Sequence, residues 1–410
     1  MKPAAKAPWC RAHRRREDFW LLAAGVALLC ATSTPLLAGP ATRSHEVTPA
    51  DYFTIANVFE VAVAPVGDQV AWVEARWEDG EKRRNQDIWV NDGQLGQDRR
   101  LTFDAAADYG IQWSPDGAWI YFSSGRKGHE QQKAPLDGET QVWRVSPSGG
   151  APQPVTRVKG GVHAFELSGD GKSLVYSVSK ELREEDPWAP LRSSFKDLTY
   201  GHGVHKVSQL WRLDLSSWRR ELLVDEGRAI YDFTVSPDMS RIAMLTTPTP
   251  ALVTREGWSR LDIWEARPLP EAATPLVGDK DVSDLPDTGA GAESGDAKRS
   301  LPGHVRSLPD DLWRKSAPSP YGWMIAPAWS SDSARLAFRV DFDGYPGTPF
   351  VARFDRLDAT GFPEIQPVVR PGEVSVVGGH MAWRPRSHEL CFTADDHART
   401  PVICVDDAGD

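Results

Sequence analysis

Residues 111–124 carry a pattern of apolar and polar positions that returns along most of the chain. Two short alternating runs flank the turn Ser114–Gly117. Within this turn Pro115 presets the backbone angle, Asp116 caps the turn with its side chain, and Gly117 accepts a positive φ angle. Alternation with a period of two, interrupted by such a turn, is typical of a β-hairpin. Related hairpins are predicted at residues 61–73, 165–177, 233–245, 328–339 and 381–392.

Each hairpin is usually followed by a third strand with a Trp in its centre, as in Asp87–Val90. The other third strands are predicted at residues 141–145, 209–213 and 261–264, and fourth short strands at residues 100–102, 154–156 and 221–223. Four strands per unit of roughly 40–50 residues are typical of β-propeller blades, as in WD40-like repeats. We therefore predict an all-β fold, a six-bladed β-propeller of four-stranded antiparallel blades, with seven blades as the alternative.

Two of the spacings between hairpins are much longer than the others, which predicts insertions near residues 181–205 and 268–309. The first segment holds many charges and lacks strand alternation. The second is rich in Asp, Ala, Gly, Pro and Ser and has little apolar surface to bury. A poorly patterned extra blade between residues 245 and 325 is the alternative. The propeller is expected to span residues 61–410.

Residues 1–38 are predicted to be a signal peptide. An Arg-rich start is followed by the apolar stretch Phe19–Ala31, and Leu36–Ala38 offers a cleavage site. The stretch is short for a membrane-spanning helix, so we expect cleavage, with an uncleaved signal anchor as the only predicted membrane contact. The mature protein would be exported, periplasmic or extracellular. Residues 39–60 would form its lead-in, and Phe53–Phe59 would supply a strand that closes the last blade.

The two cysteines that remain after cleavage are Cys391 and Cys404. They lie in two strand-like runs on either side of the polar turn 394–400. Folding this hairpin about its midpoint places the cysteines opposite each other, and an oxidising compartment favours a disulfide between them. Two reduced, buried cysteines are the alternative.

Composition and charge exclude several classes of function. The chain of 410 residues is 40% hydrophobic and 25% charged, as expected of a globular protein, and its net charge of −10 argues against a nucleic-acid partner. It contains no phosphate-binding Gly-rich loop, so no cofactor is predicted. Among the 17 Trp residues we expect those of the strands to fill the blade cores, with a carbohydrate-stacking surface as the alternative. This series is Trp72, Trp113, Trp143, Trp211 and Trp383.

Two motifs invite a metal site, and neither is complete. His202 and His205 lie three residues apart in a Gly-rich stretch that supplies no further ligand at a firm spacing. Asp341–Gly344 is similar to the start of a calcium loop but lacks the later ligands, which favours a hairpin turn. His380 and His388 flank the first strand of the last hairpin, where surface or packing roles are expected. No metal site is predicted.

Several of these stretches resemble the prolyl oligopeptidase family of serine peptidases, in its acylaminoacyl-peptidase and dipeptidyl-peptidase-like branch. They are residues 47–51, 100–102, 111–117, 122–128, 141–143, 148–150, 200–203 and 208–211. Together they cover most of residues 47–245, and blade patterns alone continue to residue 405. The Ser-Pro-Asp-Gly hairpin is less specific, because TolB-like propellers share it.

The resemblance implies a propeller that stands over an α/β-hydrolase domain with a Ser-His-Asp triad on a Gly-X-Ser-X-Gly elbow. This chain contains no such elbow. The nearest run is Gly257–Leu261, which lacks the second Gly. We therefore expect no catalytic residue here and a catalytic domain that is absent from the chain. By resemblance the propeller would filter peptide substrates for a separate hydrolase domain. The alternative is an autonomous TolB-like module that binds a protein partner.

Overall fold

The chain divides into two compact units, residues 1–52 and residues 53–410. The computed structural model describes residues 45–78, 83–91, 98–127, 135–183, 194, 204–247, 259–267, 302–310, 313, 322–342, 345–370 and 374–406. The predicted signal peptide and most of both predicted insertions lie outside these residues. In the first unit, the Asp51 carboxylate accepts hydrogen bonds from the backbone N–H and the hydroxyl of Thr48, at 2.6 and 3.0 Å. No helix within the described stretches is long and apolar enough to cross a bilayer.

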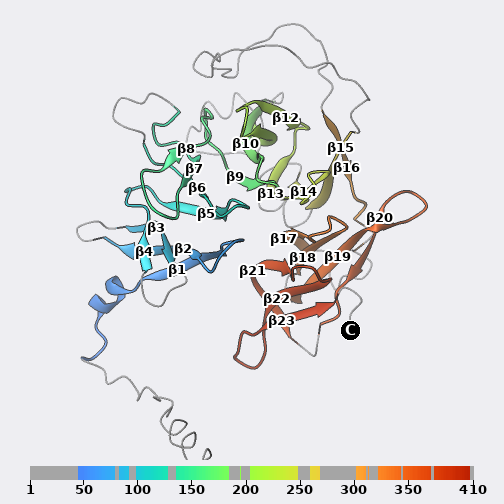
Figure 1. Ribbon diagram of the computed structural model, residues 1–410. Helices are drawn as coiled ribbons and strands as arrows, with labels where there is room; N and C mark the ends of the chain where they lie inside the picture. The colour runs from blue at the N-terminus through green and yellow to red at the C-terminus, as the bar shows by residue number, and fades with distance from the viewer. Residues whose placement is uncertain are drawn as a thin grey trace, which may run out of the picture. The chain divides into compact units, whose positions relative to one another are not determined.

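The second unit is nearly all β and is built from small antiparallel sheets whose strands follow chain order (Figure 1). Sheet 1 contains β1 (Asn57–Val63), β2 (Val70–Trp77), β3 (Arg84–Asn91) and β4 (Asp98–Arg100). Sheet 2 contains β5 (Asp108–Trp113), β6 (Ile120–Ser124), β7 (Gln141–Val145) and β8 (Gln153–Pro154). Sheet 3 contains β9 (Ala164–Leu167), β10 (Ser173–Arg183), β11 (Val204–Asp214) and β12 (Arg220–Val224).

The remaining strands form three further groups. Sheet 4 contains β13 (Ala229–Val235), β14 (Arg241–Thr247), β15 (Arg260–Ala266) and β16 (Gly303–Ser307). Sheet 5 contains β17 (Gly322–Trp329), β18 (Arg335–Phe342), β19 (Tyr345–Leu357) and β20 (Pro363–Pro367). Sheet 6 contains β21 (Ser375–Trp383), β22 (Glu389–Asp395) and β23 (Val402–Asp406). One residue pair, Gly347 with Val376, joins sheets 5 and 6 into a continuous ladder.

Four of the hairpin turns are held by the same Ser and Asp side chains. In sheet 2 the Ser114 hydroxyl donates to Asp116 at 2.5 Å and accepts from the Trp119 backbone N–H at 2.9 Å. The Asp116 carboxylate also accepts from the Ala118 N–H at 3.0 Å, which with the Ser114 bond holds its pKa below the ordinary value. Equivalent bonds form in sheets 3, 4 and 5, at Ser168, Ser236 and Ser330. The Ser-X-Asp motif therefore fixes the register of each hairpin.

Five buried apolar clusters form the core, and each lies between two consecutive sheets. The first joins sheet 1 to sheet 2 through residues such as Val73 and Phe122, and the last joins sheet 5 to sheet 6 through residues such as Val351 and Leu390. The other three join sheets 2 and 3, sheets 3 and 4, and sheets 4 and 5. Each internal sheet thus contributes its two faces to two different clusters.

The structure corrects two of the sequence predictions. Residues 303–307 lie inside the segment predicted as an insertion, yet they form β16, which pairs with β15 and completes sheet 4. The predicted closing strand at Phe53–Phe59 is wrong. Asn57–Phe59 belong to β1 and pair with β2, since the first strand of that hairpin extends back to Asn57, while Phe53 lies in the 3₁₀ helix η1 (Pro49–Thr54).

Candidate functional site at the first strands

The first strands of consecutive sheets lie against one another, from β1 to β21. Their positions can be compared because every hairpin turn opens in the same way. The backbone N–H of the turn-opening residue donates to the carbonyl five residues later at 2.8–2.9 Å in each sheet. We count positions back from this residue, so that position −1 directly precedes it. The turn-opening residues are Ala64, Ser114, Ser168, Ser236, Ser330 and Arg384.

Five of the six first strands contain a β-bulge near position −4. The pairing register shifts in β1, β5, β13, β17 and β21. In four of them the bulge includes a residue with positive φ: Glu60 at 41°, Gly110 at 67°, Ala326 at 53° and Gly378 at 80°. This conformation is strained for Glu60 and Ala326, which carry a Cβ. Bulges redirect side chains and are common beside functional sites.

Three junctions between sheets use an indole N–H. Trp113 at position −1 of sheet 2 donates to the carbonyl of Ala62 in sheet 1, at 3.0 Å. Trp329 of sheet 5 donates to the carbonyl of Thr234 in sheet 4 at 3.1 Å. In the same way Trp383 of sheet 6 donates to the carbonyl of Ala328 in sheet 5 at 3.0 Å. In each case the acceptor is at position −2 of the preceding sheet.

The junction between sheets 2 and 3 has Leu167 at position −1 and therefore lacks an indole. Here the side chain of Gln112, at position −2 of the preceding sheet, makes the hydrogen bonds between the two sheets. Its amide nitrogen donates to the carbonyl of Phe165 and its amide oxygen accepts from the Leu167 N–H, both at 3.0 Å. One neutral amide thus satisfies a donor and an acceptor on the neighbouring backbone.

The junction between sheets 3 and 4 uses a carboxyl group in the same place. Glu166, at position −2 of sheet 3, accepts from the Val235 N–H at 2.9 Å and from the Thr234 hydroxyl at 3.2 Å. Burial raises the pKa of Glu166 to about 8, and these two hydrogen bonds only partly oppose the shift. Glu166 therefore holds a proton at neutral pH. An ionisable group thus sits at a contact between two sheets.

Charged side chains also occupy position −4 in sheets 1, 4 and 6. Burial raises the pKa of Asp232 to about 6, while the Phe233 N–H, 2.9 Å from its carboxylate, and the charge of His380 lower it. Asp232 belongs to sheet 4 and His380 to sheet 6, and both stand at position −4 of their first strands. Glu60, at the same position of sheet 1, accepts from the N–H groups of Gly110 and Ile111 at 2.6 and 3.0 Å.

The first strands therefore present a set of polar side chains in equivalent positions, but no catalytic constellation. Among the described residues, no group of three His, Cys, Asp or Glu side chains could hold a metal ion. His202 and the side chain of His205 lie outside the described residues. His388, predicted as a surface or packing residue, lies 3.5 Å from the Asp332 carboxylate and is exposed. The arrangement is suited to binding and to holding sheets together.

The run similar to a calcium loop and the run nearest to a nucleophile elbow both have structural roles. Asp341 binds the guanidinium of Arg339 at 2.7 Å, and Phe342 pairs with Tyr345 across residues 343–344, which lie outside the described residues. This pairing is that of a tight hairpin. Ser259, in the run nearest to a nucleophile elbow, is fully buried and its hydroxyl lies 3.3 Å from the carbonyl of Gly322.

The predicted Trp series divides into two roles. Trp143 is buried in the cluster between sheets 1 and 2, and the partly buried Trp211 packs against the cluster between sheets 2 and 3. The partly buried Trp72 stacks on Trp89 instead. Trp113 lies in the cluster between sheets 1 and 2, Trp383 packs against the cluster between sheets 5 and 6, and both also make the indole hydrogen bonds described above. Sequence reasoning missed this second role. The signal was present in the position of these residues directly before the turn.

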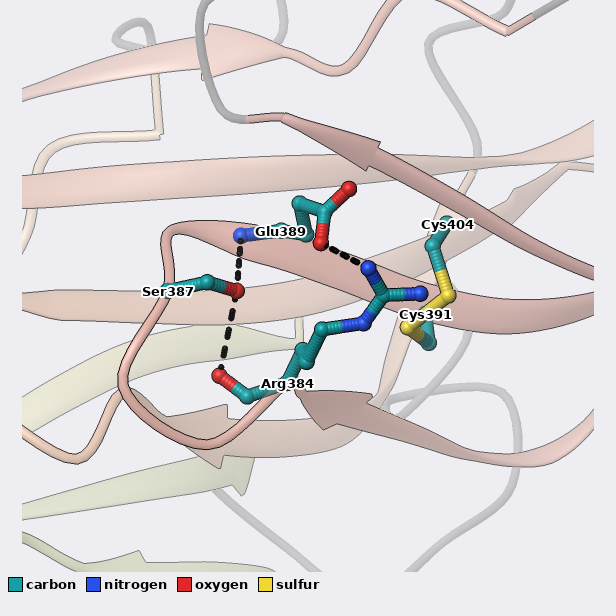
Figure 2. The surroundings of a disulfide bond; sticks show 5 residues. All are labelled: Arg384, Ser387, Glu389, Cys391 and Cys404. Carbon is teal, nitrogen blue, oxygen red and sulfur yellow. Dashed lines mark hydrogen bonds and ion pairs between the residues drawn. A yellow bond between two sulfur atoms is a disulfide. The ribbon is translucent and has the colours of Figure 1, made fainter. Parts of the chain in front are cut away.

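The sulfur atoms of Cys391 and Cys404 are bonded to each other across β22 and β23, where the two residues are directly paired (Figure 2). Figure 2 also shows the adjacent turn, in which the Ser387 hydroxyl lies between the Arg384 carbonyl and the Glu389 N–H. Arg384 and Glu389 form an ion pair beside it. The bond thus fastens the last two strands of sheet 6.

A groove of about 410 Å³ lies beside β4 and the turn between β7 and β8, with Arg99, Arg100 and Phe103 among its lining residues. At its base the guanidinium of Arg126 lies 2.5 Å from the buried carboxylate of Asp108. Arg100 is similarly paired with Asp87 at 2.7 Å. Carboxylates of the same sheets balance these two positive charges.

No family model matches the chain. Among curated proteins it is 25% identical over 206 residues to the uncharacterized peptidase YuxL of Bacillus subtilis, an alignment that covers 47% of this chain and 30% of the relative. It is 28% identical over 145 residues to dipeptidyl-peptidase 5 of Porphyromonas endodontalis, covering 35% and 19%. The chain therefore spans less than a third of the length of these relatives.

Solved structures with a similar fold include two of acylaminoacyl peptidase. The enzyme from Pyrococcus horikoshii gives a TM-score of 0.51 at 12% identity over 87% of this chain and 45% of that one. The complex of acylaminoacyl peptidase with Z-Gly-Gly-Phe-chloromethyl ketone gives a TM-score of 0.53 at 12% identity over 87% and 46%. These likenesses show the fold, which is that of β-propeller regions related to peptidases.

Proposed function

We propose that this chain is the propeller region of an exported serine peptidase of the prolyl oligopeptidase type, which admits peptides to a hydrolase domain outside residues 1–410. The observation that carries the proposal is the sequence similarity to YuxL over 206 residues. The acylaminoacyl peptidase fold supports it, since 87% of this chain aligns with less than half of that enzyme. The sequence itself contains no Gly-X-Ser-X-Gly elbow.

The first strands are the part of the fold suited to act on substrates. They follow one another in chain order, and their bulges redirect polar side chains away from the ladder. The charge of His380, in sheet 6, lowers the pKa of Asp232, in sheet 4. A peptide that passes between the first strands would meet these side chains. We propose that these side chains admit short peptides and exclude folded proteins. This is the filtering role that we propose.

The test begins with the mature chain, residues 39–410, and a fluorophosphonate probe together with short acyl-peptide substrates. We expect neither labelling nor turnover from this chain alone. The chain is then produced together with any Gly-X-Ser-X-Gly segment that the DNA encodes beyond codon 410. Cleavage of short peptides but not of folded proteins would support the proposal. Labelling of the chain alone would contradict it. If no such segment exists, the autonomous binding propeller becomes the better hypothesis.

A further inference from the structure

The carboxyl groups at position −4 of sheets 1 and 4 have different surroundings. In sheet 1, one oxygen of Glu60 accepts hydrogen bonds from the N–H groups of Gly110 and Ile111, at 2.6 and 3.0 Å. These two donors stand at positions −4 and −3 of the following sheet. The charge of Glu60 is thus offset by the backbone of its neighbour, because charge-assisted hydrogen bonds to a carboxylate are strong.

Asp232 in sheet 4 has no such pair of donors. Positions −4 and −3 of the following sheet are Ala326 and Pro327, and proline has no N–H. The Asp232 carboxylate instead accepts from the N–H of its own neighbour Phe233, at 2.9 Å. No other described residue donates a hydrogen bond to it, and its second oxygen is not sealed off from solvent. This oxygen can therefore bind a donor from outside the chain.

Position −4 carries a small residue in sheet 5 and a polar one in sheet 6. Ala326 in sheet 5 has only a methyl group as its side chain. His380 in sheet 6 is exposed and lies in a three-residue bulge, Gly378–His380, which has no partner in β22. The charge of His380 lowers the pKa of Asp232, so the two side chains interact electrostatically. Three consecutive sheets thus present a carboxyl group, a methyl group and an imidazole at the same position.

The carboxyl group of Asp232 carries a negative charge at pH 7.5. Burial raises its pKa to about 6, and the Phe233 N–H and the charge of His380 oppose this rise. The other described titratable group that interacts with Asp232 is Glu166 of sheet 3, whose pKa burial raises to about 8. The charge of Asp232 adds to that rise. Glu166 is therefore mostly protonated at pH 7.5 and leaves Asp232 as the negative group.

We propose that Asp232, together with position −4 of sheets 5 and 6, forms a subsite for the basic side chain of a peptide, the ammonium of a lysine or the guanidinium of an arginine. This preference rests on the peptide-admitting role proposed above. The basic group donates to the second oxygen of Asp232, in place of the backbone donor that Pro327 lacks. Ala326 offers no polar side chain that could occupy this oxygen instead. An aliphatic side chain of the same length makes no such bond, so the subsite distinguishes basic from neutral peptides.

The test uses the mature chain, residues 39–410, and two octapeptides of Gly and Ser that are acetylated and amidated, so that neither terminus is charged. One peptide contains two lysines, and the other contains norleucine in their place. We expect the lysine peptide to bind about fivefold more tightly at pH 7.5 and low salt, as measured by equilibrium dialysis. Asp232→Asn should make the two affinities equal, because an amide oxygen carries no net charge. The matched control, Asp68→Asn, removes one carboxylate from the exposed turn of the first hairpin and should keep the difference.

Acidification should abolish the preference in the wild type. At pH 5 Asp232 is mostly protonated, so the two peptides should bind alike, whereas Asp232→Asn should give the same ratio of affinities at both pH values. Equal affinities in the wild type at pH 7.5 would overturn the subsite, and binding of both peptides would still be consistent with the peptide-admitting role. Binding of neither peptide would contradict that role as well. A preference that survives Asp232→Asn, or one that Asp68→Asn also removes, would overturn the proposal.

A second variant keeps the test decisive if Asp232→Asn does not fold. His380→Lys places a permanent positive charge at an exposed position whose charge acts on Asp232. The lysine peptide should then lose its advantage at pH 7.5, while the denaturation midpoint should change little because the side chain at position 380 faces solvent. A preference of about fivefold that persists in the folded His380→Lys variant would mean that the basic group binds elsewhere, and the proposal would fail.

Discussion

Two kinds of junction hold consecutive sheets together, and they solve the same problem with different chemistry. Where position −1 is Trp, its indole N–H reaches back to a carbonyl of the preceding sheet, as for Trp329 and Thr234. Where position −1 is aliphatic, the preceding sheet supplies the polar side chain, which is Gln112 in one case and Glu166 in the other. Buried backbone groups must be paired in either case. The difference matters at Glu166, because neither an indole nor an amide titrates, whereas a carboxyl group does.

The largest expected effect is at an indole junction. Trp329→Ala should lower the free energy of unfolding by about 3–5 kcal/mol, since it removes a buried ring and its hydrogen bond. Trp329→Phe keeps most of the ring and should cost about 1–3 kcal/mol for the unpaired Thr234 carbonyl. Denaturant titration measures both changes.

The matched control for this change is Trp264→Phe. Trp264 is also buried, but its indole N–H has no hydrogen-bond partner. We expect this substitution to cost less than Trp329→Phe. Equal costs would show that the indole hydrogen bond does not stabilise the junction.

The carboxyl junction should make stability depend on pH. The pKa of Glu166 is about 8 in the folded chain against an ordinary value of 4.5. Between these values the folded state holds a proton that the unfolded chain has released, so the free energy of unfolding should fall as pH rises through this window. The slope contributed by this group should approach about 1.4 kcal/mol per pH unit. Unfolding at pH 5, 6.5 and 8 measures it.

Glu166→Gln should remove this contribution and make the chain more stable than the wild type at pH 8. The difference should vanish below about pH 3.5, where the wild-type carboxyl is protonated in both states. A variant with the same pH profile as the wild type would show that Glu166 is not the group responsible. Asp232, with a pKa of about 6, should remain as a weaker source of the same trend at lower pH.

The opposite substitution, from amide to carboxyl, tests the junction between sheets 2 and 3. Gln112→Glu replaces an amide that donates to the Phe165 carbonyl and accepts from the Leu167 N–H. An ionised carboxylate would face that carbonyl without a donor, which should cost about 1–3 kcal/mol at pH 8. The cost should shrink at pH 5, where the new carboxyl can hold a proton. A cost that does not vary with pH would contradict this interpretation.

The smallest expected effect lies in the turns that position both kinds of junction. Gly117 has φ of +69°, and a Cβ added there would meet only ordinary contacts at 3.7 Å or more. Gly117→Ala should therefore cost about 1 kcal/mol through backbone strain alone. Ala118→Gly is the control in the same turn. A cost of several kcal/mol would mean that the turn packs more tightly than described.

The repeated hairpins were predictable from sequence because each turn residue has a local reason to be there. Ser114, Asp116 and Gly117 hold a turn through contacts within five residues, so their spacing alone reveals the hairpin. β16 escaped prediction for the opposite reason. It pairs with a strand from which it is separated by a long segment of low apolar content, and no local signal marks it.

The candidate site was only partly accessible to sequence reasoning. Trp113 was interpreted as core filling because apolar periodicity reports which face is buried, not where an N–H group points. The role of Glu166 depends on a backbone N–H 69 residues further along the chain, at Val235. Its raised pKa arises from burial between two sheets, which no single-strand pattern records. The pairing of Cys391 with Cys404 was easier to foresee, since one hairpin contains both residues.

Consecutive sheets share apolar clusters, and this has a consequence for local unfolding. Sheets 2 to 5 each belong to two apolar clusters, whereas sheets 1 and 6 belong to one. Amide hydrogen exchange should therefore be slowest in sheets 3 and 4 and fastest at the two ends, as in a zipper that frays from both sides. The two ends should not fray alike, because β22 and β23 are tied by the Cys391–Cys404 bond while β1 is held by hydrogen bonds and packing alone. Adding a reductant should then accelerate exchange in sheet 6 and leave sheet 1 unchanged.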